Sequence, residues 1–185
     1  MEQKINFKIN VIAETAILIS LSFVLRTFLI LFRMPNGGSV NLGLTPLIIL
    51  SFRRNAFVGC LAGLIVSIIH VFSSVHVPPA SDAFKIVFCI LFDYLIPYSC
   101  VGLCSLLKKS TLDNRIKIFL GVSLVFLINI VCFCTSGLTI WKDAIPNDQN
   151  ILKYVLFYNL VFCFPNYLAN MLSCISLKKF CFPKI

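Results

Sequence analysis

The amino-acid sequence predicts an all-α, polytopic membrane protein with six transmembrane helices and both termini in the cytoplasm. Of its 185 residues, 59% are hydrophobic and only 12% are charged, and the mean hydropathy is +0.96. A soluble domain has about 45–50% apolar and about 25% charged residues, so these values exclude a soluble globule and a disordered chain. We expect one domain over residues 1–185, because no internal repeat or low-complexity tract interrupts the pattern.

Six apolar segments are the predicted spans: residues 11–32, 42–52, 55–73, 84–107, 118–141 and 154–177. About 20 helical residues are needed to cross a hydrocarbon core of about 30 Å. The second segment has only about eleven residues before Arg53 and Arg54. It is expected to tilt into the protein, to be extended by residues 39–41, or to be partly irregular. Because short spans are tolerated beside protein-lined cavities, a ligand site near the first loop is plausible.

The orientation follows from the basic residues in the loops, which favour the cytoplasmic side. One side of the predicted bundle carries most of them: Lys4, Lys8, Arg53, Arg54, Lys108, Lys109, Arg115, Lys117, Lys178, Lys179 and Lys184. The other side carries only Arg33, Lys85, Lys142 and Lys153. The three outer loops are then residues 33–41, 74–83 and 142–153, and they contain turn formers such as Gly37, Gly38, Asn36, Pro79 and Asn147.

The composition offers no enzyme chemistry. The net charge of +9 is explained by the inner loops rather than by nucleic acid, and the nine cysteines match no zinc or redox spacing. His70 and His76 have no nucleophile or metal partner at a recognisable spacing, and we expect them at a surface or helix end. A Gly-rich phosphate loop with a lysine is missing, so we expect no ATP site, no metal and no cofactor on this chain.

Charged residues within the predicted spans are the stronger signal, because burying a charge in a membrane is costly. Glu14 and Arg26 lie near opposite ends of the first span, where both side chains can reach the interfaces. Asp93 lies inside the fourth span, next to Tyr94 and four residues before Pro97. Its short carboxylate either pairs with a base such as Arg26 or receives the donors or positive charge of a ligand.

Aromatic and polar side chains mark the outer ends of the last two spans. Trp141, the only tryptophan, is either an interfacial anchor or a stacking platform for a flat or cationic ligand. Tyr154, Tyr158 and Asn159 add polar groups nearby, and Asn159 needs a hydrogen-bond partner on another helix or on a substrate.

Small residues recur four apart on two spans, and such spacing lets helices approach closely. Ala16 and Ser20, with Ala13 on nearly the same face, lie on the first span. Gly59 and Gly63 lie on the third. Each set serves either packing within the bundle or docking onto another membrane subunit.

Several motifs, taken together, resemble those of one known family. They are the run Met34-Pro35-Asn36-Gly37-Gly38-Ser39-Val40-Asn41-Leu42, Pro46, Phe52-Arg53-Arg54, Ala13-Glu14-Thr15-Ala16, Asp93-Tyr94, Ser136-Gly137 with Trp141, and Tyr154 to Tyr158-Asn159. They are similar to those of the thiamine-specific S components, the substrate-binding membrane subunits of energy-coupling factor (ECF) vitamin transporters, and the last three stand in the same order as that family's binding motifs. The resemblance spans nearly the whole chain, and the first-loop motif is its most specific part.

The resemblance implies a six-helix protein without catalytic activity that captures thiamine (vitamin B1) from outside and delivers it through an ATP-driven ECF complex. The implied partners are thiamine, a transmembrane coupling subunit, two ATPase subunits and the lipid bilayer, with no nucleic acid. The implied substrate-binding residues are Trp141, Asp93, Tyr94, Gly137, Phe133, Tyr154 and Asn159, of which Trp141 stacks on a ring and Gly137 leaves room. The implied partner-binding residues are Ala13, Ala16 and Ser20.

Two positions depart from the family pattern. The family commonly has a histidine where this chain has Phe133, and a glutamate where it has Asp93. A thiamine precursor such as the pyrimidine moiety, or another small vitamin, is therefore an alternative ligand. An ion-coupled secondary transporter is the alternative from another class, although Asp93 is its only central carboxylate and repeat symmetry is missing.

Overall fold

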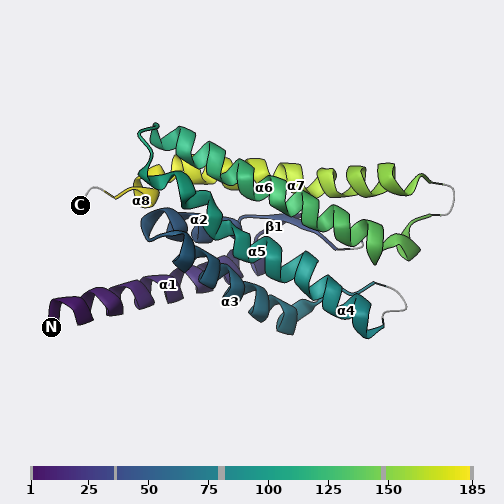
Figure 1. The fold of residues 1–185 in the computed structure, drawn as a ribbon, viewed down its shortest axis with the longest axis horizontal. Helices are drawn as coiled ribbons and strands as arrows, with labels where there is room; N and C mark the ends of the chain where they lie inside the picture. Colours follow the sequence, from purple (N-terminus) through teal and green to yellow (C-terminus); the bar gives the residue numbers. More distant parts are fainter. Residues whose placement is uncertain (1, 36, 79–81, 147–148, 184–185) are drawn as a thin grey trace.

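The protein is a bundle of long helices crossed by one short hairpin (Figure 1). The computed structural model describes residues 2–35, 37–78, 82–146 and 149–183. Five helical segments in these ranges are long and apolar enough to cross a membrane: Ile9–Phe28, Ala56–Ser74, Ala83–Lys109, Asn114–Thr139 and Ile151–Ser176. The chain is thus a multi-pass helical membrane protein, as its composition predicts. Asn36, Pro79 and Asn147, expected in outer turns, lie outside the described residues.

The first helix ends earlier than the apolar pattern predicts. Helix α1 (Glu2–Phe28) is followed by strand β1 (Ile30–Arg33), which pairs antiparallel with β2 (Ser39–Asn41). The prediction of a continuous span over residues 11–32 is therefore wrong at its end. Gly37 and Gly38 adopt φ values of 93° and 91°, which a residue with a Cβ rarely adopts, so the hairpin turn depends on glycine here.

The short second segment lies inside the protein. Helix α2 (Leu44–Arg53) has 10 residues, and its positions from Thr45 to Phe52 are all buried. Leu47, Leu50 and Phe52 have no exposed surface and lie at the centre of the main apolar core. Because α2 is surrounded by other helices, it does not need the length of a lipid-facing span.

The fourth span is the least regular helix of the bundle. Helix α3 (Ala56–Ser74) precedes it, and the span itself runs through α4 (Ala83–Cys89), the π-helix η1 (Ile90–Leu95), α5 (Ile96–Ser99) and the 3₁₀-helix η2 (Cys100–Lys109). Pro97 lacks the N–H that would bond the carbonyl of Asp93 four residues earlier, and its ring would collide with that carbonyl. The widened π turn accommodates both effects and contains Asp93.

Two long helices complete the bundle. Helices α6 (Asn114–Thr139) and α7 (Ile151–Ser176) lie side by side and are joined through the 3₁₀ turn η3 (Lys142–Ala144), and α8 (Lys178–Cys181) follows (Figure 1). The start of α1 and α8 lie at the same end of the bundle, and η3 lies at the opposite end (Figure 1). That arrangement agrees with termini on one side of the membrane, and their cytoplasmic location stays a prediction.

Candidate functional site

A cavity of about 190 Å³ lies between the hairpin, the π-helix and the η3 ends of α6 and α7. All seven residues that the resemblance implies for substrate binding line it: Asp93, Tyr94, Phe133, Gly137, Trp141, Tyr154 and Asn159. They come from η1, α6, α7 and the start of the η3 turn, so segments about 65 positions apart in sequence meet at one place. The cavity is lined by aromatic rings with a few polar groups between them, as small-molecule sites commonly are.

Asp93 is the acidic centre of the cavity. The widened turn of η1 carries it, and its Oδ2 atom accepts hydrogen bonds from Ser136 Oγ at 2.8 Å, Trp141 Nε1 at 3.0 Å and Cys89 Sγ at 3.3 Å. All three donors therefore stabilise one carboxylate oxygen and fix the orientation of the group. A carboxylate held in this way can receive a cationic or hydrogen-bond-donating ligand without reorganising.

Trp141 lies beside Asp93, where α6 ends. Its indole N–H bond to Asp93 fixes the ring, and the following η3 turn is tied to α4 by an ion pair between Lys85 Nζ and Asp143 Oδ2 at 2.8 Å. Asp143 is exposed, and the hydrogen bond and charge of Lys85 hold its carboxyl pKa below the ordinary value. The arrangement presents an aromatic face next to a carboxylate, which suits a flat cation.

Tyr94 has a structural partner as well as a place in the cavity wall. Its hydroxyl accepts a hydrogen bond from the backbone N–H of His76 at 2.7 Å, and the single S–H of Cys89 is shared between the His76 carbonyl at 3.2 Å and Asp93 Oδ2 at 3.3 Å. These bonds hold the segment after α3 against η1. His76 itself lines the cavity. The sequence placed it at a surface or helix end, and nothing in its local pattern signalled the cavity.

Helix α7 supplies the opposite wall. The rings of Tyr154 and Tyr158 stack with centroids 5.9 Å apart, and the Tyr158 hydroxyl donates to the Gly37 carbonyl at 3.0 Å. Asn159 is buried, and its amide donates to the Val155 carbonyl at 3.0 Å. The same amide also donates to the Cys134 sulfur of α6 at 3.9 Å, so Asn159 has a partner on another helix, one of the alternatives that the sequence predicted, as well as on its own.

Two of the implied ligand residues also serve helix packing. A Cβ atom on Gly137 would lie 2.7 Å from Val155 Cγ1, so the glycine lets α6 approach α7 closely. The Phe133 ring packs against Phe162, with centroids 5.6 Å apart. Their positions in the cavity wall are consistent with ligand contact, and their contacts to α7 shape that wall.

The hairpin covers one side of the cavity and is fastened to α7. The Asn41 N–H donates to Asn166 Oδ1 at 3.1 Å, and Asn170 Nδ2 donates to the Asn41 carbonyl at 2.8 Å. Gly37 and Gly38 line the cavity from the hairpin turn. These bonds place the first-loop motif over the site.

Arg26 also lines the cavity, and sequence reasoning gave it a different environment. Its guanidinium lies 4.7 Å from the centroid of the Tyr98 ring, a cation–π contact. Within the described part of the chain Arg26 makes no ion pair with Asp93, so that pairing is not the reason for either charge. The prediction that Arg26 extends to the membrane interface is also wrong, because its side chain turns into the bundle.

The two small-residue sets differ in their surroundings. Ala13, Ala16 and Ser20 are exposed on α1, whereas Gly59 and Gly63 are buried. The glycines lie against Gly102 and Tyr98 of the fourth span, which excludes them as an outer docking face. The α1 set remains available to a partner.

Comparisons with known proteins identify the family of this chain. A family model of thiamine transporter proteins (Thia_YuaJ) matches residues 12–184. The chain is 24% identical over 169 residues to the thiamine transporter ThiT of Bacillus subtilis (strain 168), covering 86% of this chain and 83% of that protein.

A solved structure of ThiT from Listeria monocytogenes has a similar fold. The TM-score is 0.73 at 15% identity, and the match covers 95% of this chain and 99% of that chain. At this identity the likeness shows the fold alone, that of a multi-pass helical protein. Because the family model spans nearly the whole chain, the chain belongs to the thiamine transporter protein family (Thia_YuaJ).

Proposed function

We propose that this chain captures thiamine from outside the cell in the cavity around Asp93 and Trp141, and delivers it through an ATP-driven ECF complex. The observation that supports this proposal is the meeting of all seven implied ligand residues in one cavity. Asp93 attracts the positive charge of the thiazolium ring, and Trp141 offers an aromatic face beside it. Tyr154 and Asn159 contribute polar contacts, and Phe133 an apolar one.

The identity of the small molecule that co-purifies with the protein tests the proposed substrate directly. Small molecules bound to the purified protein are extracted by denaturation and identified by mass spectrometry. We expect thiamine. Recovery of only the pyrimidine moiety would support the alternative ligand.

The chain acts as a binding subunit, and energy comes from its partners. Purified alone, it should bind thiamine and hydrolyse no ATP. Accumulation in vesicles should require the coupling subunit and the two ATPases. Concentrative uptake by this chain alone, driven by a proton or sodium gradient, would instead establish a secondary transporter.

The coupling subunit docks on the exposed small-residue face of α1, formed by Ala13, Ala16 and Ser20. Small side chains there let a partner helix approach closely, and bulky ones hold it away. Replacing Ala16 and Ser20 together with leucine should abolish co-purification and transport while thiamine binding persists. Loss of thiamine binding in that variant would mean that the face serves the bundle itself.

A further inference from the structure

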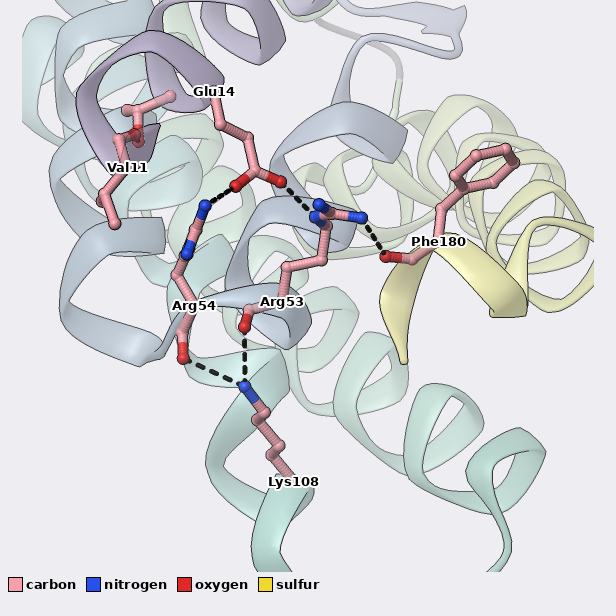
Figure 2. A network of polar contacts seen from close by, with 7 residues as sticks. Val11, Glu14, Arg53, Arg54, Lys108 and Phe180 are labelled. Carbon is pink, nitrogen blue, oxygen red and sulfur yellow. Dashed lines mark hydrogen bonds and ion pairs between the residues drawn. The ribbon is translucent and has the colours of Figure 1, made fainter. Parts of the chain in front are cut away.

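A network of charged groups joins α1 to α2 at the end of the bundle where α8 lies (Figure 2). The Glu14 carboxylate meets two adjacent arginines: Oε1 accepts a hydrogen bond from Arg53 Nε, and Oε2 forms an ion pair with Arg54 Nη2. Figure 2 shows the carboxylate pointing between the two guanidinium groups. Glu14 is therefore paired with groups of α2, a partnership that the sequence did not predict.

Two further segments converge on the same arginines. Lys108 Nζ, from η2, donates to the carbonyls of Arg53 at 2.8 Å and Arg54 at 3.0 Å (Figure 2). Arg53 Nη1 donates to the Phe180 carbonyl of α8 at 3.3 Å. The end of α2 is thus fixed by η2 and α8, and Glu14 connects α1 to that fixed point.

The ion pairs of Glu14 with Arg53 and Arg54 lie largely out of contact with water. The side chain of Glu14 is only 16% exposed, and those of Arg53 and Arg54 are 30% and 21% exposed. A half-buried carboxylate near a membrane is costly without partners, and removal of one partner leaves the other charges uncompensated. The Glu14 pair is therefore a firm attachment rather than a solvated surface bridge.

Helix α1 is little buried around Glu14, and the contact of its Arg26 with the Tyr98 ring lies toward its other end. In its most apolar window only 6% of the residues are buried, against 28–39% in the other four spans. Ser22 Oγ donates to the Gly43 carbonyl at 2.6 Å, and this bond holds α1 about two turns beyond Glu14. Between Glu14 and the start of α1, the helix exposes large apolar side chains such as Ile9 and Ile12.

Glu14 lies in sequence between Ala13 and Ala16, and successive residues of an α-helix are about 100° apart around the axis. With Glu14 fixed on the α2 arginines, the rotation of α1 is set, and Ala13, Ala16 and Ser20 face outward. We propose that Glu14 is a positioning residue for coupling, which orients the small-residue face of α1 for the coupling subunit. This inference rests on the proposed function, because it presupposes docking on α1.

The test compares thiamine binding with complex formation in a set of charge variants. Glu14→Gln removes the charge and keeps the size, and Arg53→Gln with Arg54→Gln removes the partners. Asp113→Asn is the matched control, since it removes one exposed carboxylate at the α6 N-cap, where asparagine caps equally well. Thiamine affinity is measured by quenching of Trp141 fluorescence, and complex formation by co-purification with the coupling and ATPase subunits.

We expect Glu14→Gln to keep thiamine affinity within about twofold and to reduce complex formation at least about tenfold, within the usual range of coupling between sites. The double arginine variant should lose as much, and the triple variant no more, because all three residues act through one attachment. Asp113→Asn should keep both properties. If Glu14→Gln yields no folded protein, Arg54→Gln replaces it in the test, because it weakens the attachment but keeps the pair of Glu14 with Arg53. Complex formation should then fall while thiamine affinity persists, and undiminished complex formation would overturn the proposal.

Two results would overturn the proposal. One is undiminished complex formation in Glu14→Gln, and the other is a parallel loss of thiamine binding, which would make Glu14 a support of the whole fold. The leucine variant of Ala16 and Ser20 separates this failure from that of the proposed function. If it too keeps the complex, α1 is not the docking helix and both ideas fail; if it alone loses the complex, only the positioning role fails.

Discussion

Replacing Asp93 with asparagine tests whether the carboxylate binds a cation. Asparagine has nearly the same size, and its side-chain oxygen can take the place of Oδ2, which accepts from Ser136, Trp141 and Cys89. The wall of the cavity should therefore persist while the negative charge is lost. Any change in affinity then reports mainly on charge.

The size of the effect follows from Coulomb's law. Two unit charges about 5 Å apart interact by about 3 kcal/mol at an effective dielectric constant of about 20. Since 1.4 kcal/mol corresponds to a factor of ten, the Kd of thiamine should rise about 100-fold in Asp93→Asn. A neutral pyrimidine analogue has no such attraction to lose, and its Kd should rise less than about threefold.

Titration calorimetry with both ligands measures the two changes on the same protein. Asp82→Asn is the matched control, because Asp82 caps α4 at the same end of the bundle, is exposed and does not line the cavity. It removes the same charge and should leave both affinities unchanged. Equal losses for thiamine and the neutral analogue in Asp93→Asn would refute the reasoning and make the carboxylate a structural partner of Trp141.

Three further changes address the surroundings of the cavity. Trp141→Ala should weaken thiamine binding by about 1–3 kcal/mol through lost stacking and cation–π contact, while Trp141→Phe, which keeps a ring, should lose less; unchanged calorimetric affinity would leave only an anchoring role. Gly38→Ala should cost about 1–2 kcal/mol and lower the Tm, because φ is 91° there and a Cβ would lie 2.9 Å from the Phe162 ring; an unchanged Tm would contradict this. The Lys85–Asp143 pair lowers the pKa of Asp143, so its contribution to ordering η3 is complete above about pH 4 and disappears as the pH falls through the lowered pKa. Asp143→Asn should therefore weaken thiamine binding at pH 7. The Kd values of the variant and the unchanged protein should become equal only in acid, and Kd measured over a pH series checks this.

The membrane class could be predicted from the sequence because long apolar segments have few structural alternatives. The end of the first span could not, because residues 29–32 are apolar and suit a helix or a strand equally well. Pairing with β2 decided the outcome, and that contact depends on a turn through Gly37 and Gly38. Likewise, the short second segment signalled irregularity, but only the packing of the other helices shows that α2 is buried.

The candidate site was predicted through a resemblance rather than through periodicity. The geometry brings the implied residues together, but their contact with a ligand stays a prediction. The environments of Arg26, His76 and Glu14 were not foreseen, because each depends on a tertiary neighbour. Glu14 meets Arg53 across 39 positions of the chain, and no local pattern encodes such a distance.

The π-helix η1 has a consequence for length variation within the family. An α-helix turns about 100° and rises 1.5 Å per residue. A π turn takes up one residue more than an α turn, so deleting one residue from Ile90–Leu95 would let this stretch close to α-helical geometry with α4 and α5 nearly in their present orientation. The widened turn that carries Asp93 would be lost, and with it the placement of the carboxylate beside Ser136 and Trp141. Sequences that share this cavity should therefore tolerate substitutions in the stretch far better than insertions or deletions.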